Sequence, residues 1–421
     1  MSRTIRLPFG KKFLRAELRA DRILPRRVAG PADEHEAVRQ ALEQPIATPP
    51  LAEIVRPRET VAILVNDVTR LARTDLMLPP LVATLNQAGV RDEDILVVYA
   101  LGNHRPQTEA ERRRLIGEGM FRRLQTLEHD ARDEANLVTV GRTSFGNVVQ
   151  INRRVLEVER IILTGEIIHH LIAGYSGGRK SVVPGVAGFN TTTYNHRMIL
   201  DSRCRSGVLE GNPAHEDMLE GCRMVEPDFM VNLVLTPAGK LVRVVAGHYD
   251  LAHREGCRAV DAMLRVEVDQ PYDLVVASAG GHPLDIDLRQ AHKGLENACR
   301  CLRPGGAILY YAECANGAGS GPLEEFLWRY GNPEAMERAL RENFVVGGHK
   351  AWWLARLGRR FDVHLVSRLD AALVRRCGFE SVPPEEHAGR LRELLGKAGT
   401  AARVAAIPGA GFTLPALRGE K

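Results

Sequence analysis

Residues 161–196, IILTGEIIHHLIAGYSGGRKSVVPGVAGFNTTTYNH, join an expected buried strand to a loop that carries chemically active side chains. The apolar run at 161–163 predicts the strand, and the glycine-rich turn that follows leads to Lys180. From His169 to His196, 28 residues hold three imidazoles and one amine. Because glycines let a backbone approach a ligand closely, this concentration predicts a functional site.

Part of this segment nearly matches a phosphate-binding loop. Residues 174–181 follow the pattern G-x-x-x-x-G-K-[ST], except that Arg179 stands where the second glycine belongs. A side chain there obstructs the wrapping of the chain around phosphates, which argues against nucleotide hydrolysis. The amides of Gly177 and Gly178, beside Lys180, still predict a seat for a single phosphate.

Composition excludes several classes of protein. A length of 421 residues predicts two or three domains, and the net charge of +5, from 57 basic and 52 acidic residues, is small. With aromatics at 5%, the chain lacks the composition of a nucleic-acid or membrane surface. The seven cysteines show no C-x-x-C spacing and predict reduced, structural thiols. The sequence has neither a signal-peptide pattern nor a run of 18 apolar residues, so we expect a soluble cytoplasmic protein.

The first half of the chain alternates strands with helices. We expect a hairpin around Pro8, a helix at 34–43, strands at 60–65 and 94–101, and a helix at 81–88 with Pro79 and Pro80 in its first turn. Polar residues follow both strands, and ligands of open α/β sheets lie at the carboxyl ends of strands. Asp67, Arg70, His104 and the loop 169–180 are therefore expected to converge. Alternatively, Asp67 caps a helix or pairs with Arg70, and His104 is an ordinary turn residue.

The second half predicts another α/β region. A hairpin is expected at 229–235 and 241–245, a linker near 267–271, and strands at 272–277 and 307–311. The Gly-Gly after the first of these strands is no dinucleotide fingerprint. In the helix that follows, Arg289 and Lys293 are like charges four residues apart, which indicates either an acidic ligand or a solvated face. The tail after residue 397 is expected to be loose.

Five motifs together resemble one family, the lactate racemases. They are D-V-T-R at 67–70, G-N-H-R-P at 102–106, H-L-I-A-G-Y-S-G-G-R-K at 170–180, His196 sixteen residues later, and R-Q-A-H-K-G at 289–294. The resemblance spans nearly the full chain. It implies two α/β domains with mainly parallel sheets, residues 1–268 and 269–421, and an active site in the cleft between them. It also implies a cofactor, a nickel-pincer nucleotide derived from pyridinium-3,5-bisthiocarboxylic acid mononucleotide, which other proteins must make.

The resemblance assigns roles to the matching residues. Lys180 would hold the cofactor through a thioamide, and His196 would bind nickel. His104 and His170 would be the catalytic acid and base. His170 is preferred to His169 because the family's spacing to the lysine is ten residues. Further cofactor contacts would come from Asp67, Thr69, Ser176, Gly177 and Gly178, and substrate contacts from Arg70, Arg289, Gln290, Lys293 and Trp353.

The implied reaction inverts C2 of a 2-hydroxy acid by removal and return of hydride through a 2-keto acid. One histidine takes the hydroxyl proton and a second returns it on the other face. Two departures from the family concern the substrate: Arg289 replaces a usual tyrosine, and Leu171-Ile172 replaces a Pro-Phe pair. We hypothesise that Arg289 admits a second acidic group, so that malate competes with lactate.

Two other classes stay open at this stage. A kinase or NTPase built on SGGRKS predicts ATP turnover and no mass added to Lys180. A non-catalytic nickel- or nucleotide-binding protein predicts nickel without racemisation. Expected partners are a small 2-hydroxy acid and the cofactor-making proteins, without nucleic acid or membrane, and the oligomeric state is left open.

Overall fold

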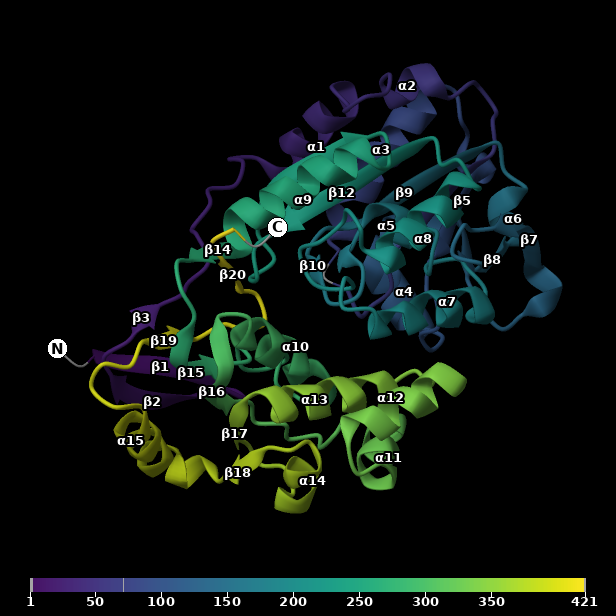
Figure 1. The fold of residues 1–421 in the computed structure, drawn as a ribbon. Helices are drawn as coiled ribbons and strands as arrows, with labels where there is room; N and C mark the ends of the chain where they lie inside the picture. Colours follow the sequence, from purple (N-terminus) through teal and green to yellow (C-terminus); the bar gives the residue numbers. More distant parts are fainter. Residues whose placement is uncertain (1–2, 71, 420–421) are drawn as a thin grey trace. The chain divides into compact units, whose positions relative to one another are not determined.

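The computed structural model describes residues 3–70 and 72–419, which fall into two compact units. Unit 1 comprises Met1–Arg27 and Met263–Lys421, and unit 2 comprises Val28–Ala262. Each unit is built around a six-stranded sheet (Figure 1). The fold is therefore α/β with mainly parallel sheets, as the sequence predicts.

Unit 2 has the strand order β13-β12-β9-β4-β5-β6, in which only β13 is antiparallel to its neighbour. Its elements are α1 (Glu34–Glu43), α2 (Leu51–Ile54), β4 (Val61–Val65), α3 (Thr74–Gln87), β5 (Ile95–Tyr99), α4 (Glu109–Ile116), α5 (Glu118–Arg123), β6 (Gln125–Glu128), β7 (Leu137–Arg142), β8 (Val148–Asn152), α6 (Arg153–Leu156), β9 (Arg160–Glu166), β10 (His169–His170), β11 (Gly174–Tyr175), the 3-10 helix η3 (Gly178–Ser181), α7 (Phe189–His196), α8 (Pro213–Arg223), β12 (Phe229–Leu235), β13 (Leu241–Gly247) and α9 (Leu251–Leu264), whose last two residues belong to unit 1.

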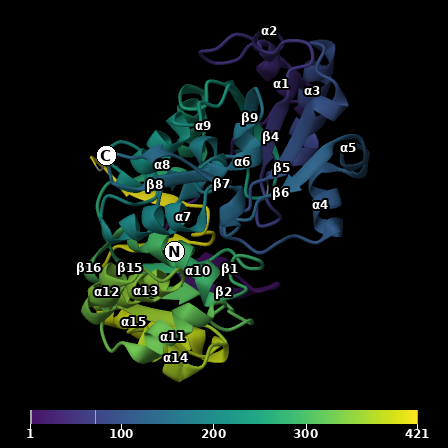
Figure 2. The same cartoon turned by 90° about the vertical axis from the view of Figure 1, so that its right-hand side faces the viewer.

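The central strands of unit 2 are buried on both faces. All five residues of β4 are inaccessible to solvent, because α1 and α3 pack on one face of the sheet and η3 lies against β9. Figure 2 shows α3 beside β4 and β5. Fully apolar strands of this kind suit a parallel sheet that is covered on both sides. The parallel strands β9, β4 and β5 are neighbours, so their carboxyl ends share one edge.

Unit 1 has an entirely parallel sheet in the order β18-β17-β16-β15-β19-β3. Its elements are β1 (Arg3–Phe9), β2 (Lys12–Leu18), β3 (Asp21–Arg22), β14 (Arg265–Val268), β15 (Tyr272–Ser278), α10 (Leu288–Cys299), β16 (Leu302–Tyr311), α11 (Gly321–Arg329), α12 (Pro333–Glu342), α13 (Gly348–Arg360), β17 (Asp362–Val366), α14 (Ala371–Arg376), β18 (Glu380–Val382), α15 (His387–Ala398), β19 (Val404–Ile407) and β20 (Leu414–Leu417). The hairpin β1–β2 and α15 share a core with this sheet, while α10 and α13 contact β15 and β17 (Figure 1).

The first residues of the chain belong with its last part, which differs from the expected division at residue 268. Hairpin β1–β2 buries Leu7 and Phe9 in the core of unit 1, and β3 pairs with β19. The Ser278 hydroxyl bonds to the Pro8 carbonyl, and the Gly10 amide donates to Asp285 across 2.6 Å. These contacts place residues 1–27 in unit 1, although the start of its second segment, at Met263, lies close to the expected linker.

Two local expectations were wrong. Helix α3 begins at Thr74 rather than near residue 81, so Pro79 and Pro80 lie inside it instead of in its first turn. The free energy gained by burying Leu76, Met77 and Leu78 outweighs the loss of the backbone hydrogen bonds that the two prolines remove.

The tail after residue 397 is not loose, because Val404–Ile407 forms β19 between β15 and β3. Its small side chains, Ala405 and Ala406, gave no strong strand signal.

All seven cysteines are free and buried. Within the described residues, no helix combines the length and apolarity needed to cross a bilayer.

Candidate active site

The candidate residues of unit 2 follow three neighbouring parallel strands. Asp67 comes after β4, His104 after β5, and His170 and Lys180 after β9. Backbone hydrogen bonds tie two of these loops together: Gly185 donates to the Lys180 carbonyl at 3.0 Å, and Gly102 donates to the Gly185 carbonyl at 2.9 Å. The sheet therefore gathers these side chains at one edge, as predicted for an open α/β sheet.

His104 is oriented by the carboxylate of Asp67. Its Nδ1 makes a short hydrogen bond to Asp67 Oδ2, while Oδ1 accepts from the Thr69 hydroxyl at 2.6 Å and from the Thr69 amide at 3.0 Å. Since a carboxylate accepts, Nδ1 carries the proton and the Nε2 lone pair points away from Asp67. The Asp67 side chain is 4% exposed and that of His104 45%, so the imidazole extends outward from a buried anchor.

The Asp67 carboxylate is stabilised in its ionised form. Burial opposes ionisation, but the hydrogen bond and charge of His104, the Thr69 hydrogen bond and the charge of Arg70 outweigh burial and lower the Asp67 pKa. Asp67 therefore pairs mainly with His104 rather than acting as a helix cap.

His170 contacts the proposed anchor lysine. Its Nε2 lies 3.4 Å from Lys180 Nζ, and its Nδ1 accepts from the amides of Ile172 and Ala173, both at 3.2 Å. Strands β10 and β11 form a two-residue antiparallel pair in which His169 is opposite Tyr175 and His170 opposite Gly174. Successive strand side chains point to opposite faces, so only one of the two histidines can approach Lys180.

His169 lies in different surroundings. Its Nε2 is 2.8 Å from Asp261 Oδ1, which also accepts from the Tyr175 hydroxyl at 2.8 Å. The side chain of His169 is only 8% exposed. His169 is thus bonded to Asp261, whereas His170 contacts Lys180. This agrees with the prediction, made from spacing, that His170 is the histidine beside Lys180.

The Lys180 amine is unusually easy to deprotonate. Burial, reinforced by the positive charges of Arg179 and Arg70, holds the pKa of Lys180 well below its ordinary value. Proteins use lysines whose charged form is destabilised in this way as nucleophiles. Because Arg70 acts electrostatically on both Lys180 and Asp67, it links the two groups.

Arg179, which breaks the phosphate-loop pattern, supports the loop from inside. Its buried guanidinium donates to the carbonyls of Ala173 at 2.7 Å, Tyr175 at 2.9 Å and Gly177 at 3.2 Å. Burial lowers the Arg179 pKa to about 10, which still leaves the group charged at neutral pH. A loop that points its carbonyls inward at a guanidinium cannot wrap phosphates as a nucleotide-binding loop does.

The glycine-rich turn is occupied by its own contacts. The amide of Gly178 donates to Asn232 Oδ1 at 2.8 Å, and the Ser176 hydroxyl bonds to the amide of Ile168 and the carbonyl of Glu166. Gly177 has φ +76°, and a Cβ there would lie 2.5 Å from Asn232 Oδ1. The structure therefore gives Ser176 and Gly178 roles in loop packing, and the Gly178 amide, one of the two expected to bind a phosphate, already donates to Asn232.

His196 ends helix α7 with one ring nitrogen fixed. Its Nδ1 donates to the Thr192 carbonyl at 2.9 Å, which leaves the lone pair on Nε2, the arrangement that metal-binding histidines commonly have. Helix α8 packs against both α7 and η3, which carries Lys180. In the part of the chain that the structure describes, no three His, Cys, Asp or Glu side chains form a metal-binding group. Any metal here would need most of its ligands from elsewhere.

Sequence reasoning missed two residues beside the predicted ones. The side-chain oxygen of Asn66 and both polar atoms of the Asn103 amide are shielded from solvent, and within residues 3–70 and 72–419 they have no hydrogen-bond partner. Buried polar atoms without partners are rare and suggest a bound group. Each asparagine directly precedes a predicted site residue, so its position at a strand end was the available signal.

The predicted substrate residues of unit 1 lie on two packed helices. On α10, Lys293 Nζ donates to Gln290 Oε1 at 2.9 Å, and Arg289 lies 3.8 Å from Asp287, the N-cap residue. On α13, Trp352 is buried in the core, whereas Trp353 is half-buried and meets Trp352 edge-on. Arg289 and Lys293, the two like charges noted in the sequence, thus each have a polar neighbour in the protein.

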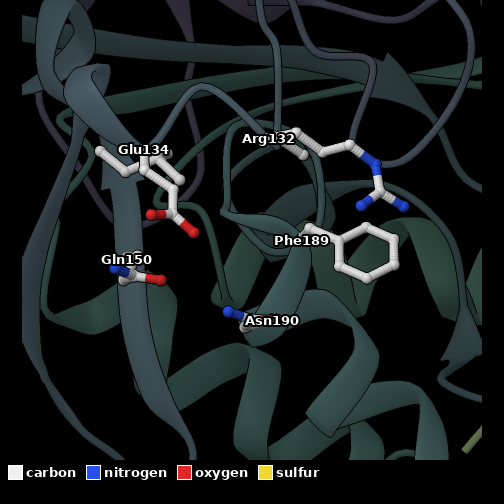
Figure 3. A pocket seen from close by; sticks show the side chains of 7 residues that line it. Arg132, Glu134, Gln150, Phe189 and Asn190 are labelled. Carbon is white, nitrogen blue, oxygen red and sulfur yellow. The ribbon is translucent and has the colours of Figure 1, made fainter.

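A separate cavity involves none of the predicted residues. It measures about 150 Å³ and is lined in part by Arg132, Glu134, Gln150 and Phe189 (Figure 3). The Arg132 guanidinium lies 3.6 Å from the centre of the Phe189 ring. This cavity is smaller than the roughly 300 Å³ of typical ligand pockets, so it does not compete with the strand-end site.

The fold and the strand-end residues together define a class: an α/β protein in which two histidines and a lysine follow neighbouring parallel strands of one sheet. The family model described as "Lactate racemase N-terminal domain" matches residues 9–207, and the one described as "Lactate racemase C-terminal domain" matches residues 268–412. The chain belongs to the lactate racemase family. Membership confirms the resemblance predicted from the motifs and, with it, the enzyme class, an isomerase.

Individual relatives agree with the family models. The lactate racemase of Thermoanaerobacterium thermosaccharolyticum is 33% identical over 323 residues, 75% of each chain. That of Lactiplantibacillus plantarum is 29% identical over 96% of this chain and 97% of its own. The solved lactate racemase apoprotein from T. thermosaccharolyticum matches with a TM-score of 0.88 and 27% identity over 98% of this chain and 100% of its own. A Thermotoga maritima protein shares the fold, with a TM-score of 0.66 and 17% identity over 93% of this chain and 100% of its own.

Proposed function

We propose that this protein racemises a 2-hydroxy acid with a nickel-pincer nucleotide attached to Lys180. One observation carries the proposal: a half-buried amine lies in contact with one imidazole, while a carboxylate-oriented second imidazole follows the neighbouring strand of the same sheet edge. When bound, the cofactor would supply the hydride acceptor that C2 of a 2-hydroxy acid requires. The side chains of this protein would hold the cofactor, bind the substrate and transfer its protons.

The residues present fit such a group. Lys180 offers a nucleophilic amine, and His196 offers an Nε2 lone pair fixed by its bond to Thr192. The amides of Asn66 and Asn103 offer buried polar atoms that lack protein partners among the described residues. Because the protein supplies no three-residue metal cluster in the described ranges, a metal that brings most of its own ligands suits it.

His104 is the base in this proposal. Asp67 holds its proton on Nδ1, so Nε2 can accept the proton of the substrate hydroxyl, and the resulting imidazolium is stabilised by the same carboxylate. His170 is the second proton carrier, required because the two enantiomers present the hydroxyl from different sides. Arg70 and Lys293 are proposed to bind the substrate carboxylate, with Gln290 and Trp353 as further contacts.

Lys180→Ala is the central test. The protein would be co-expressed with the cofactor-making enzymes and nickel, and its intact mass and its racemisation of D-lactate and D-malate would be measured. We expect added mass on the wild type and none on K180A, with racemisation lowered by at least about 10³-fold. K240A, which changes an exposed lysine, is the matched control and should behave as wild type. Full racemisation by K180A, or ATP turnover without added mass, would contradict the proposal.

Substrate choice depends on Arg289 in this proposal. Arg289 is exposed on α10, and a guanidinium can bind a second carboxylate in bidentate fashion. We expect the wild type to favour malate over lactate in kcat/KM, and Arg289→Tyr to reverse the ratio by about tenfold or more. A wild type that clearly prefers lactate would remove malate from the proposal and leave the racemase function intact. The cytoplasmic location likewise stays a prediction, supported by seven free cysteines.

A further inference from the structure

The hydrogen bonds around His170 determine which of its nitrogens carries a proton. Backbone amides only donate, and two of them, from Ile172 and Ala173, point at Nδ1. Nδ1 must therefore carry a lone pair. A neutral imidazole has one proton, so that proton is on Nε2, the nitrogen that faces Lys180 at 3.4 Å.

This assignment fixes the state of the lysine. An ammonium group has three donors and no acceptor, so it cannot accept from Nε2–H. An uncharged amine has a lone pair and can. An uncharged Nζ that accepts from His170 Nε2–H fits the 3.4 Å contact between the two nitrogens.

The surroundings of Lys180 agree with an uncharged amine. Two positive charges, those of Arg179 and Arg70, act on Lys180, and burial acts in the same direction. Arg179 is held in place by three backbone carbonyls, so its charge cannot move away.

We propose that His170 is a positioning residue for cofactor attachment: by donating Nε2–H it holds Lys180 as an uncharged nucleophilic amine. The inference rests on the proposed function only in taking Lys180 as the attachment point. In the attachment step, Nζ releases the hydrogen bond from Nε2–H, its freed lone pair forms a C–N bond to the carbonyl carbon of a thiocarboxylic acid, and the C–O bond breaks. The oxygen leaves as water with one proton from the amine and one from the acid, and the sulfur stays in the thioamide.

Competitive acetylation of the protein expressed without cofactor tests this inference. Limiting isotopically heavy acetic anhydride is followed by complete light acetylation after denaturation, and peptide masses give the fraction of heavy label at each of the eight lysines. We expect labelling of Lys180 to be nearly constant from pH 7 to pH 9. Labelling of exposed Lys240 should rise about tenfold per pH unit, because only its small unprotonated fraction reacts. A tenfold rise per unit at Lys180 would overturn the inference.

Variants separate the role of His170 from the effect of burial alone. His170→Gln places an amide oxygen, an acceptor for an ammonium group, near Nζ, so we expect the labelling of Lys180 to become pH-dependent. His169→Gln changes the neighbouring imidazole, which bonds to Asp261, and should leave the labelling profile of Lys180 unchanged. An unchanged profile in H170Q would also overturn the inference. Missing cofactor mass on the co-expressed wild type would instead overturn the proposed function, because the labelling experiment needs no cofactor.

Discussion

His104 and His170 have the same side chain but opposite hydrogen-bonding surroundings. A carboxylate faces Nδ1 of His104 and fixes the proton there, whereas two backbone amides face Nδ1 of His170 and fix the proton on Nε2. Nε2 of His104 therefore carries a lone pair, while Nε2 of His170 carries a proton directed at Lys180. The difference teaches that, under the proposed function, the two proton carriers are not equivalent before the cofactor is attached.

Removing either imidazole is expected to have the largest effect on racemisation. We expect His104→Gln and His170→Gln each to lower racemisation by about 10³-fold, because each removes one of the two proposed acid–base groups. Only H170Q should change the acetylation profile of Lys180. Equal effects of both variants on Lys180 would remove the distinction between the histidines. Nitrogen-15 NMR of the protein without cofactor should show His104 protonated on Nδ1 and His170 on Nε2.

Asp67→Asn is expected to have the next largest effect. An asparagine amide can donate to Nδ1, which would move the proton of His104 to Nε2 and remove its basic lone pair. We expect racemisation to fall by about 10²-fold to 10³-fold, with cofactor mass retained. Thr69→Val, the control, removes one hydrogen bond to the same carboxylate and should cost less than about tenfold. Equal losses in the two variants would contradict the orienting role of Asp67.

Asp67→Asn should also change how the stability of the protein depends on pH. Because the pKa of Asp67 is lowered by folding, its ionised form stabilises the protein above the unfolded pKa near 4, and this contribution is lost as the pH falls through the folded pKa. Urea unfolding should therefore show D67N less stable than wild type at pH 7, with the difference shrinking below about pH 4. Asp75→Asn, at an exposed position, should show little difference at either pH.

His169→Gln should have the smallest effect. His169 bonds to Asp261 beside Tyr175 and does not share the face of His170, so its loss concerns packing rather than proton transfer. We expect racemisation within about twofold of wild type and a loss of roughly 1 kcal/mol in the free energy of unfolding by urea. A loss comparable to that of H170Q would reverse the assignment of the two neighbouring histidines.

The sequence predicted the edge of the sheet better than the details of the loop. Apolar strands followed by Asp67, His104 and His170 predict one edge because parallel strands align their carboxyl ends, and the structure brings them there. The sequence alone could not predict that Arg179 turns inward, because burial of a guanidinium depends on carbonyls that only the folded loop presents. The contribution of residues 1–27 to unit 1 was also hidden, because β3 pairs with a strand nearly 400 residues later.

The contact between His170 and Lys180 has a consequence for the order of events in the life of the protein. An amide nitrogen, unlike an amine, has no lone pair free to accept a hydrogen bond, so thioamide formation would turn the acceptor facing Nε2 into a donor. The imidazole must then change its proton arrangement or its orientation. Maturation would thereby release the second proton carrier, and a newly synthesised chain would keep that carrier out of the racemisation cycle until the cofactor is in place.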